Sequence, residues 1–299
     1  MKTLLLTDPL PARHFTTAIH AIAPEAELIE YRRDITDAEL ADVEVVLGWR
    51  FPTGVAGRLP KLKWVCAVAA GVEKLLVPDL APAVPVSRIV DTEQAEGIAQ
   101  FVVMMALRHA RSLVGYEVLQ RERAWKRQPV AAVRSRVAVL GMGTMGGAVA
   151  RLLGAVGFEV QGWSRRSGVA LDAVLAAADI VVCALPLTAQ TDSVLDARAF
   201  ALMPKGGYLI NIARGAHAVE PDLIAAVTSG HLAGAALDVQ RNEPMVADDP
   251  LWAVPGITIT PHIAAQSSPQ MIAAQFVAGL RCVQRGEMPP QVVDRARGY

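Results

Sequence analysis

Three polar residues in the second half of the chain have the side-chain types that reduction of a keto acid requires. Arg214 and His262 each directly follow a predicted strand, and Glu243 lies in the loop after another. The planar fork of an arginine binds a carboxylate, and a histidine donates a proton near neutral pH. A neighbouring carboxylate stabilises the imidazolium and orients its ring. We therefore predict that Arg214, Glu243 and His262 are catalytic.

The segments that carry these residues alternate short apolar runs with helical stretches. Six strands are predicted, at residues 137–140, 159–163, 180–184, 208–212, 233–237 and 258–260. Strands separated by helices indicate a doubly wound parallel sheet, the Rossmann architecture. Ligands of such sheets bind outside the carboxyl ends of the strands, which is where Arg214 and His262 are expected.

A glycine-rich turn follows the first of these six strands and opens a predicted helix. Its sequence is Gly141-Met142-Gly143-Thr144-Met145-Gly146. Gly141 permits a tight turn, Gly143 lets the backbone approach a pyrophosphate, and Gly146 allows close packing of helix on strand. The helix N-terminus offers N–H groups to the phosphates. A dinucleotide site is predicted here, and the alternative is a tight turn that binds no ligand.

The turn after the second strand indicates which dinucleotide binds. An NAD site usually has a carboxylate at this position for the ribose hydroxyls. This chain has Ser164-Arg165-Arg166-Ser167 instead. Two arginines and two hydroxyls suit a 2′-phosphate, which a carboxylate would repel. We predict NADP(H) in preference to NAD(H), and the alternative is a solvated basic turn.

The first part of the chain predicts a second parallel sheet with helices on its faces. Strands are expected at residues 2–6, 26–31, 43–49 and 62–68, with a helix over 11–22. Long helices are expected at 93–111, as a connector, and at 269–285. The fold class is therefore α/β, with a Rossmann nucleotide domain at 93–266 and a flavodoxin-like α/β substrate domain formed by 1–92 and 267–299.

The order of the motifs resembles the D-isomer-specific 2-hydroxyacid dehydrogenases over nearly the whole chain. These motifs are Gly-x-Gly-x-x-Gly, Asn-x-Ala-Arg-Gly, Leu-Asp-Val, Glu-Pro and Thr-Pro-His. The resemblance implies the same catalytic Arg214, Glu243 and His262, and it implies that Asp238 bonds the nicotinamide carboxamide. It also implies that the loop at 69–72 binds the substrate carboxylate through backbone N–H groups. One departure is Gln100-Phe101, where the family often has Glu-His or Glu-Tyr.

Three further segments resemble the glyoxylate/hydroxypyruvate reductase A branch of that family. They are residues 47–50 (Leu-Gly-Trp-Arg), 163–165 (Trp-Ser-Arg) and 293–299 at the end of the chain. The resemblance implies an NADPH-preferring reduction of glyoxylate and hydroxypyruvate to glycolate and D-glycerate. It further implies that Trp49 lines the substrate pocket and that the protein is a homodimer.

The complete predicted sites combine these motifs. The predicted cofactor-binding residues are Gly141, Gly143, Thr144, Met145, Gly146, Ser164, Arg165, Arg166, Leu185, Pro186, Thr191, Ile212, Ala213 and Asp238. The predicted substrate-binding residues are Trp49, Ala70, Gly71, Val72 and Arg214. Among the other histidines, His217 is a candidate to border the cofactor, and His14, His20, His109 and His231 are expected to be surface or capping residues.

Bulk composition excludes several other classes of protein. The chain has 299 residues, 53% of them apolar, and its 29 basic and 29 acidic residues cancel. A neutral chain lacks the field that attracts nucleic acid or an anionic membrane. Neither a signal peptide nor a membrane helix is expected, and no residues have metal-ligand spacing. Cys66, Cys183 and Cys282 have apolar neighbours and indicate free thiols in a reducing cytoplasm.

Two other functions remain open at this point. One is an NAD-linked dehydrogenase of the phosphoglycerate dehydrogenase type, which would favour an acidic residue near Ser164. The other is a non-catalytic dinucleotide sensor, which would need no complete set of Arg, Glu and His.

Overall fold

The computed structural model describes residues 1–128 and 135–298. Its internal contacts divide the chain into two compact units. The first unit comprises Met1–Asp91 and Ser267–Tyr299, and the second comprises Thr92–Gln266.

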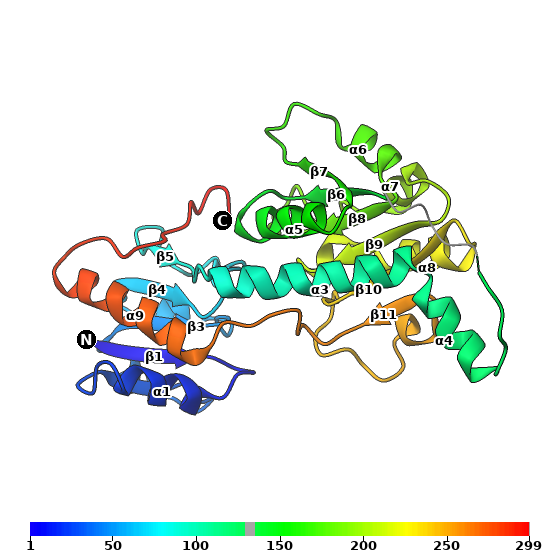
Figure 1. The fold of residues 1–299 in the computed structure, drawn as a ribbon. Coiled ribbons are helices and arrows are strands. Elements are labelled where there is room, and N and C mark those ends of the chain that lie inside the picture. Colours follow the sequence, from blue (N-terminus) through cyan, green and yellow to red (C-terminus); the bar gives the residue numbers. More distant parts are fainter. Residues whose placement is uncertain (129–134, 299) are drawn as a thin grey trace. The chain divides into compact units, whose positions relative to one another are not determined.

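The first unit contains a parallel sheet with the strand order β2-β1-β3-β4-β5, which is the flavodoxin-like order. The strands are β1 (Lys2–Leu6), β2 (Glu27–Glu30), β3 (Val43–Gly48), β4 (Trp64–Ala67) and β5 (Val86–Ser87). Helices α1 (Ala12–His20) and α9 (Pro269–Gln284) contact each other on one face of this sheet (Figure 1). The short α2 (Asp37–Leu40) and the 3₁₀ turn Ala56–Arg58 lie on the other face.

An aromatic pair joins β4 to α9 in the core of the first unit. The ring of Trp64 stacks on Phe276 with their centroids 5.4 Å apart, and its indole N–H donates to the Ser87 hydroxyl. Gly279 makes this packing possible, because a Cβ there would lie 2.5 Å from the Trp64 ring. The C-terminal helix is thereby part of the core of the N-terminal unit.

The second unit contains a parallel sheet with the strand order β11-β10-β9-β8-β6-β7. The strands are β6 (Arg136–Leu140), β7 (Glu159–Trp163), β8 (Ile180–Cys183), β9 (Gly207–Asn211), β10 (Leu232–Leu237) and β11 (Ile257–Ile259). The direction of winding reverses between β6 and β8, which makes their carboxyl ends the topological switch point. Both sheets confirm the predicted fold class. Within the described ranges no strand lies outside β7, whereas the usual Rossmann sheet has one there.

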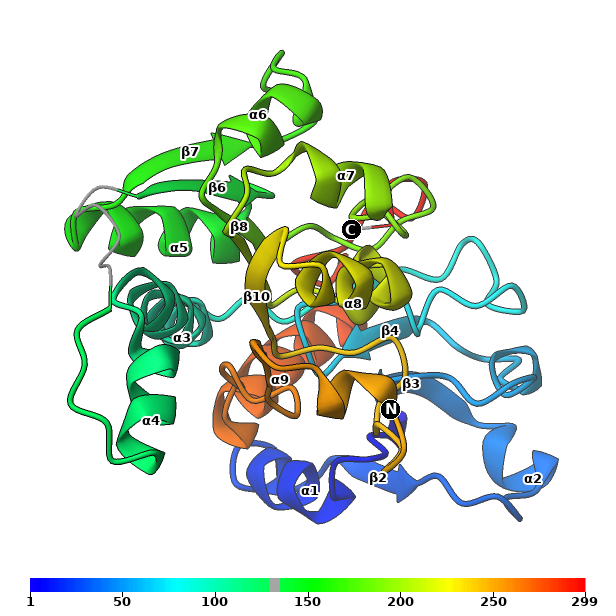
Figure 2. The same cartoon turned by 90° about the vertical axis from the view of Figure 1, so that its right-hand side faces the viewer.

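Helices cover both faces of the second sheet because side chains alternate along its buried strands. Helices α3 (Thr92–Ala110) and α5 (Thr144–Ala155) pack together on one face. Helices α6 (Leu171–Ala177), α7 (Ala197–Leu202) and α8 (Glu220–Thr228) form the other face (Figure 2). Helix α4 (Leu113–Arg121), which the sequence reading missed, has no buried residue in this chain.

One histidine was misassigned from the sequence. His109 is not an ordinary surface residue, since its ring stacks on Tyr208 at a centroid distance of 4.3 Å. Burial lowers the pKa of His109, and nearby Asp179 opposes this shift. Among the described residues, no helix has the length and apolar character needed to cross a membrane.

Candidate active site

The glycine turn occupies the switch point of the second sheet. Gly141 has φ +98°, and a Cβ there would lie 2.5 Å from the carbonyl oxygen of Ala184 at the end of the neighbouring β8. A Cβ at Gly146 would lie 1.7 Å from the carbonyl oxygen of Gly141. Around Gly143, in contrast, there is open space, and no side chain caps the helix that begins at Thr144. The turn thus leaves room beside a helix N-terminus, which suits a phosphate.

The basic turn at residues 164–167 follows β7 and is internally closed. The Ser167 backbone N–H donates to the Ser164 carbonyl at 2.9 Å, and the Ser167 hydroxyl donates to the same oxygen at 2.7 Å. Just before the turn, the buried indole N–H of Trp163 donates to the Val169 carbonyl at 2.9 Å. Arg165 and Arg166 project from the turn as exposed side chains. Two cations are therefore held on a short, defined turn beside the glycine loop.

The loop after β8 is folded around the hydroxyl of Thr191, which is buried. This hydroxyl donates to the Pro186 carbonyl at 2.7 Å and accepts the Thr188 N–H at 2.8 Å. Leu185 is also buried. Thr191, one of the predicted cofactor residues, thus holds the shape of this loop through the hydrogen bonds of its hydroxyl group.

The turn after β9 positions Arg214. The fully buried Asn211 accepts the Ala213 N–H and donates to the Arg214 carbonyl at 2.9 Å. Ile212 and Ala213 are buried, and the Arg214 guanidinium donates to the Ala213 carbonyl at 2.7 Å. Asn211 was quoted within the motif but was not predicted as a site residue. Its place at the start of the Asn-x-Ala-Arg run, at the end of a strand, was the available signal.

Asp238 at the end of β10 is buried and accepts three hydrogen bonds from the segment around His262. Its carboxylate accepts from the Thr260 hydroxyl at 2.6 Å and from the backbone N–H groups of Ile263 and Ala264, each at 2.9 Å. Since all three donors flank His262, Asp238 fixes the backbone on which the catalytic candidate lies. The contact of Asp238 with the nicotinamide carboxamide remains a prediction.

Glu243 and His262 are in direct contact. The carboxylate Oε2 lies 3.0 Å from Nδ1 of His262, and Oε1 accepts the Gln240 backbone N–H at 3.1 Å. Since Nδ1 contacts the carboxylate, Nε2 is the ring nitrogen on the opposite side of the imidazole. The His262 side chain is 31% exposed and the Glu243 side chain 25% exposed, so both are partly accessible to solvent.

His262 has an unusual backbone conformation for a residue with a side chain. Its φ is 57°, in the left-handed region that costs non-glycine residues energy. The His262 N–H donates to the Asp238 carbonyl at 2.8 Å, which holds this conformation. Such strain clusters at functional sites, where surrounding bonds over-determine one residue.

Gly215 accounts for the close approach of the neighbouring loops. A Cβ at this position would lie 1.9 Å from the Gln240 carbonyl carbon and 2.2 Å from the Arg241 nitrogen. The backbone that follows Arg214 therefore packs directly on the loop that carries Glu243. Gln240, also missed from the sequence, is buried and donates to the carbonyls of Leu237 and Thr260, which joins the ends of β10 and β11.

The substrate residues predicted in the first unit follow its buried strands. Trp49 comes after β3, and the Lys74 ammonium lies 5.6 Å from the centre of its ring. Ala70, Gly71 and Val72 follow β4, and the Val72 side chain is buried. Within residues 1–128 and 135–298, no hydrogen bond uses the backbone N–H groups of these three residues. Such a turn has donors to offer to a carboxylate.

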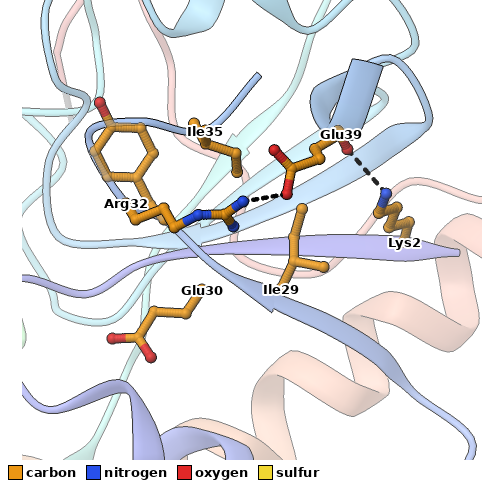
Figure 3. Close-up of a pocket in the computed structure, with 7 residues that line it drawn as sticks. Lys2, Ile29, Glu30, Arg32, Ile35 and Glu39 are labelled. Atoms are coloured by element: carbon orange, nitrogen blue, oxygen red, sulfur yellow. Dashed lines mark hydrogen bonds and ion pairs between the residues drawn. The ribbon is translucent and has the colours of Figure 1, made fainter. Parts of the chain in front are cut away.

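A cavity of about 460 Å³ in the first unit lies at the edge strand β2 and contains none of the predicted substrate residues (Figure 3). Both of its cations contact Glu39. Arg32 forms an ion pair with Glu39, and the Lys2 ammonium donates to the Glu39 carbonyl at 2.8 Å. This cavity is a poor candidate for a keto acid site because its cations already have partners.

Comparison with known proteins identifies a family. The model of the D-isomer specific 2-hydroxyacid dehydrogenase NAD-binding domain matches residues 103–264. The glyoxylate/hydroxypyruvate reductase A of Yersinia enterocolitica is 34% identical over 96% of both chains. That of Serratia proteamaculans is 36% identical over 86% of this chain and 88% of its own.

Solved structures give the same result. A D-isomer specific 2-hydroxyacid dehydrogenase from Xanthobacter autotrophicus, in complex with NADPH and MES, superposes with a TM-score of 0.90 at 35% identity. It covers all of this chain and 99% of its own. An NADPH-dependent glyoxylate/hydroxypyruvate reductase from Sinorhizobium meliloti, in complex with NADP and sulfate, also has a TM-score of 0.90, at 30% identity over the whole of both chains.

Proposed function

The chain belongs to the D-isomer specific 2-hydroxyacid dehydrogenase family, and we propose that it is an NADPH-dependent reductase of small 2-oxo acids. Its substrates are glyoxylate and hydroxypyruvate, and its products are glycolate and D-glycerate. The observation that carries this proposal is the contact of His262 with Glu243 in the same unit as Arg214 and the glycine turn. The full coverage by NADP-bound reductases supports it.

Each of the three polar residues has a separate task. The cofactor, when bound, supplies the hydride for the keto carbon. His262 donates a proton from Nε2 to the carbonyl oxygen, and Glu243 on Nδ1 stabilises the imidazolium and orients the ring. Arg214 binds the substrate carboxylate with its fork and polarises the carbonyl.

The residues of the second unit fit a phosphorylated dinucleotide. The open space at Gly143 accepts the pyrophosphate at the N-terminus of α5. Ser164, Arg165, Arg166 and Ser167 bind the 2′-phosphate, and no carboxylate occupies this turn. Leu185, Pro186, Thr191, Ile212, Ala213 and Asp238 complete the cofactor site.

We assign binding of the substrate carboxylate in the first unit to the turn at 70–72. Backbone N–H groups from successive residues form a concave donor site for an anion. Trp49 provides the apolar wall that limits the size of the substrate. Replacing Trp49 by Ala should extend activity toward bulkier 2-oxo acids.

The direct test measures NADPH oxidation with glyoxylate and with hydroxypyruvate, and repeats both with NADH. His262→Asn should lower kcat by about 100- to 10,000-fold, the usual contribution of a general acid. His14→Asn, on the exposed face of α1, is the matched control and should leave kcat unchanged. Tight NADPH binding without turnover across a panel of 2-oxo acids would contradict the proposal.

We also propose a homodimer that buries the exposed apolar side chains of α3, α4 and the segment after them. These are Met104, Leu107, Leu113, Val118 and Trp125. Helix α4 has no buried residue in this chain, so a partner that covers its apolar side chains would stabilise it. Val118→Asp should halve the mass in sedimentation. Val156→Asp, at an equally exposed valine at the end of α5, should not.

Location in the cytoplasm is part of the same proposal. Cys66 and Cys183 are buried free thiols, and burial raises the pKa of each to about 12. Unpaired thiols are typical of a reducing compartment. A tagged copy in its host should fractionate with cytoplasmic markers.

A further inference from the structure

His217 is a completely buried histidine three residues after Arg214, in the 3₁₀ turn Gly215–His217 that follows β9. Buried polar side chains need hydrogen-bond partners. The ring of His217 finds its partners in two loops. Its Nδ1 lies 3.2 Å from the Arg214 backbone nitrogen, and its Nε2 lies 3.3 Å from the Pro186 carbonyl oxygen.

These partners define the tautomer. The Pro186 carbonyl can only accept, so Nε2 carries a hydrogen. The Arg214 N–H can only donate, so Nδ1 presents its lone pair. The Arg214 carbonyl lies 3.0 Å from the same nitrogen, but it already accepts from Asn211 and from the His217 backbone N–H. Burial lowers the pKa of His217, which favours the neutral ring.

The two loops that His217 joins have different tasks. Pro186 lies after β8, at the switch point, and its carbonyl also accepts from Thr191. Arg214 lies after the adjacent strand β9. The two loop backbones already pair, since Ser193 N–H donates to Ala216 and Leu195 N–H donates to His217. The ring adds a side-chain bridge between the two loops, from the Arg214 backbone nitrogen to the Pro186 carbonyl.

We propose that His217 is a positioning residue that, as the neutral Nε2–H tautomer, sets Arg214 in register with the cofactor loop at Pro186. The inference rests on the proposed function, because it assigns substrate binding to Arg214 and cofactor binding to Pro186. In this proposal His217 acts through the two loops that its ring joins.

Two conservative variants separate the two bonds. His217→Asn keeps an acceptor near the place of Nδ1 and loses the donor to Pro186. His217→Gln keeps a donor near the place of Nε2 and loses the acceptor for Arg214. A hydrogen bond contributes about 1 kcal/mol, which corresponds to about a fivefold change. The Asn variant should weaken NADPH binding about fivefold, measured by fluorescence titration, with the KM for the oxo acid unchanged. The Gln variant should raise that KM about fivefold and leave NADPH affinity unchanged.

Thermal unfolding and NMR complete the test. His217→Leu loses both bonds and should show both defects. The opposite outcome is that the Asn and Gln variants both show a weaker NADPH affinity and a higher KM, in the same proportion and in step with their decrease in Tm. In that case His217 is merely structural and the proposal fails. Nitrogen NMR of histidine-labelled protein at neutral pH should show the Nε2–H tautomer. An Nδ1–H tautomer or an imidazolium would overturn it.

Failure of the proposed function is recognisable separately. A wild-type protein that binds NADPH and reduces no 2-oxo acid would refute the reductase activity. The difference in NADPH affinity between the Asn and Gln variants would still decide whether His217 positions the Pro186 loop.

Discussion

The two sheets share a strand order but differ in the turn after the first strand. Both have the order second, first, third, fourth, fifth, and the sheet of the second unit adds one strand. After β1 the chain reads Thr7-Asp8-Pro9-Leu10-Pro11, where Asp8 pairs with Arg50 and the Thr7 hydroxyl donates to the Leu10 carbonyl. After β6 it reads as the glycine turn.

The difference teaches which part of the fold selects the ligand. The two prolines after β1 have no N–H, and Asp8 carries the wrong charge for a phosphate. The glycines after β6 leave donors and space. The common strand order provides an edge at which ligands can bind, and we propose that the residues of one turn decide whether a dinucleotide binds there.

The largest effect on cofactor binding should come from closing the glycine turn. Gly146→Ala places a Cβ 1.7 Å from the Gly141 carbonyl oxygen. Since backbone must move, NADPH affinity should fall by about 100-fold, at the upper end of overpacking costs. Gly147→Ala is the matched control, because nothing lies within 4 Å of its Cβ. Equal affinities for the two variants, in a fluorescence titration, would show that the turn has no cofactor role.

A core substitution in the first unit should lower stability without affecting cofactor binding. Trp64→Phe loses packing against Phe276 and the donor to Ser87. The free energy of unfolding should fall by about 1–3 kcal/mol, measured by urea denaturation, while the NADPH dissociation constant stays unchanged. A large change in the NADPH dissociation constant would contradict the assignment of cofactor binding to the second unit alone.

The basic turn should give a smaller and selective effect. Arg165→Ala removes one cation from the exposed turn after β7. The KM for NADPH should rise about tenfold, near 1.4 kcal/mol, and the KM for NADH should not change. Parallel increases for both cofactors would indicate a general loss of structure. Trp163→Phe removes the hydrogen bond to the Val169 carbonyl. It should raise the KM for NADPH by a smaller factor and leave the KM for NADH unchanged.

The smallest effect concerns pH. Burial lowers the pKa of His217 and of His109, both in the second unit, below the ordinary 6.5. The unfolded chain therefore takes up these protons first as the pH falls, and stability present above about 6.5 is lost below it. Urea denaturation at a series of pH values should show this decline. His109→Phe should reduce the decline, and His14→Gln, at an exposed site of the first unit, should not. An unchanged slope for His109→Phe would remove that residue from the explanation.

Sequence patterns predicted the elements whose signals are local. The buried strands appear as apolar runs, and the strand–turn–helix context of the glycine turn was sufficient to place it. The contact of Gly215 with Gln240 joins loops after two different strands, and no local pattern reports it. The partner of His109 comes from β9, so its burial was likewise invisible. Helix α4 was missed because its apolar residues face no core of this chain.

Strand β7 is bonded on one side only, to β6, within the described part of the sheet. The turn at 164–167, which we propose to distinguish NADPH from NADH, therefore follows an edge strand of the sheet. It can be lengthened, shortened or exchanged without breaking a ladder of backbone bonds. Under that proposal, grafting a few residues into this turn should change the cofactor preference and leave unaltered the strand ends that are followed by Arg214 and His262.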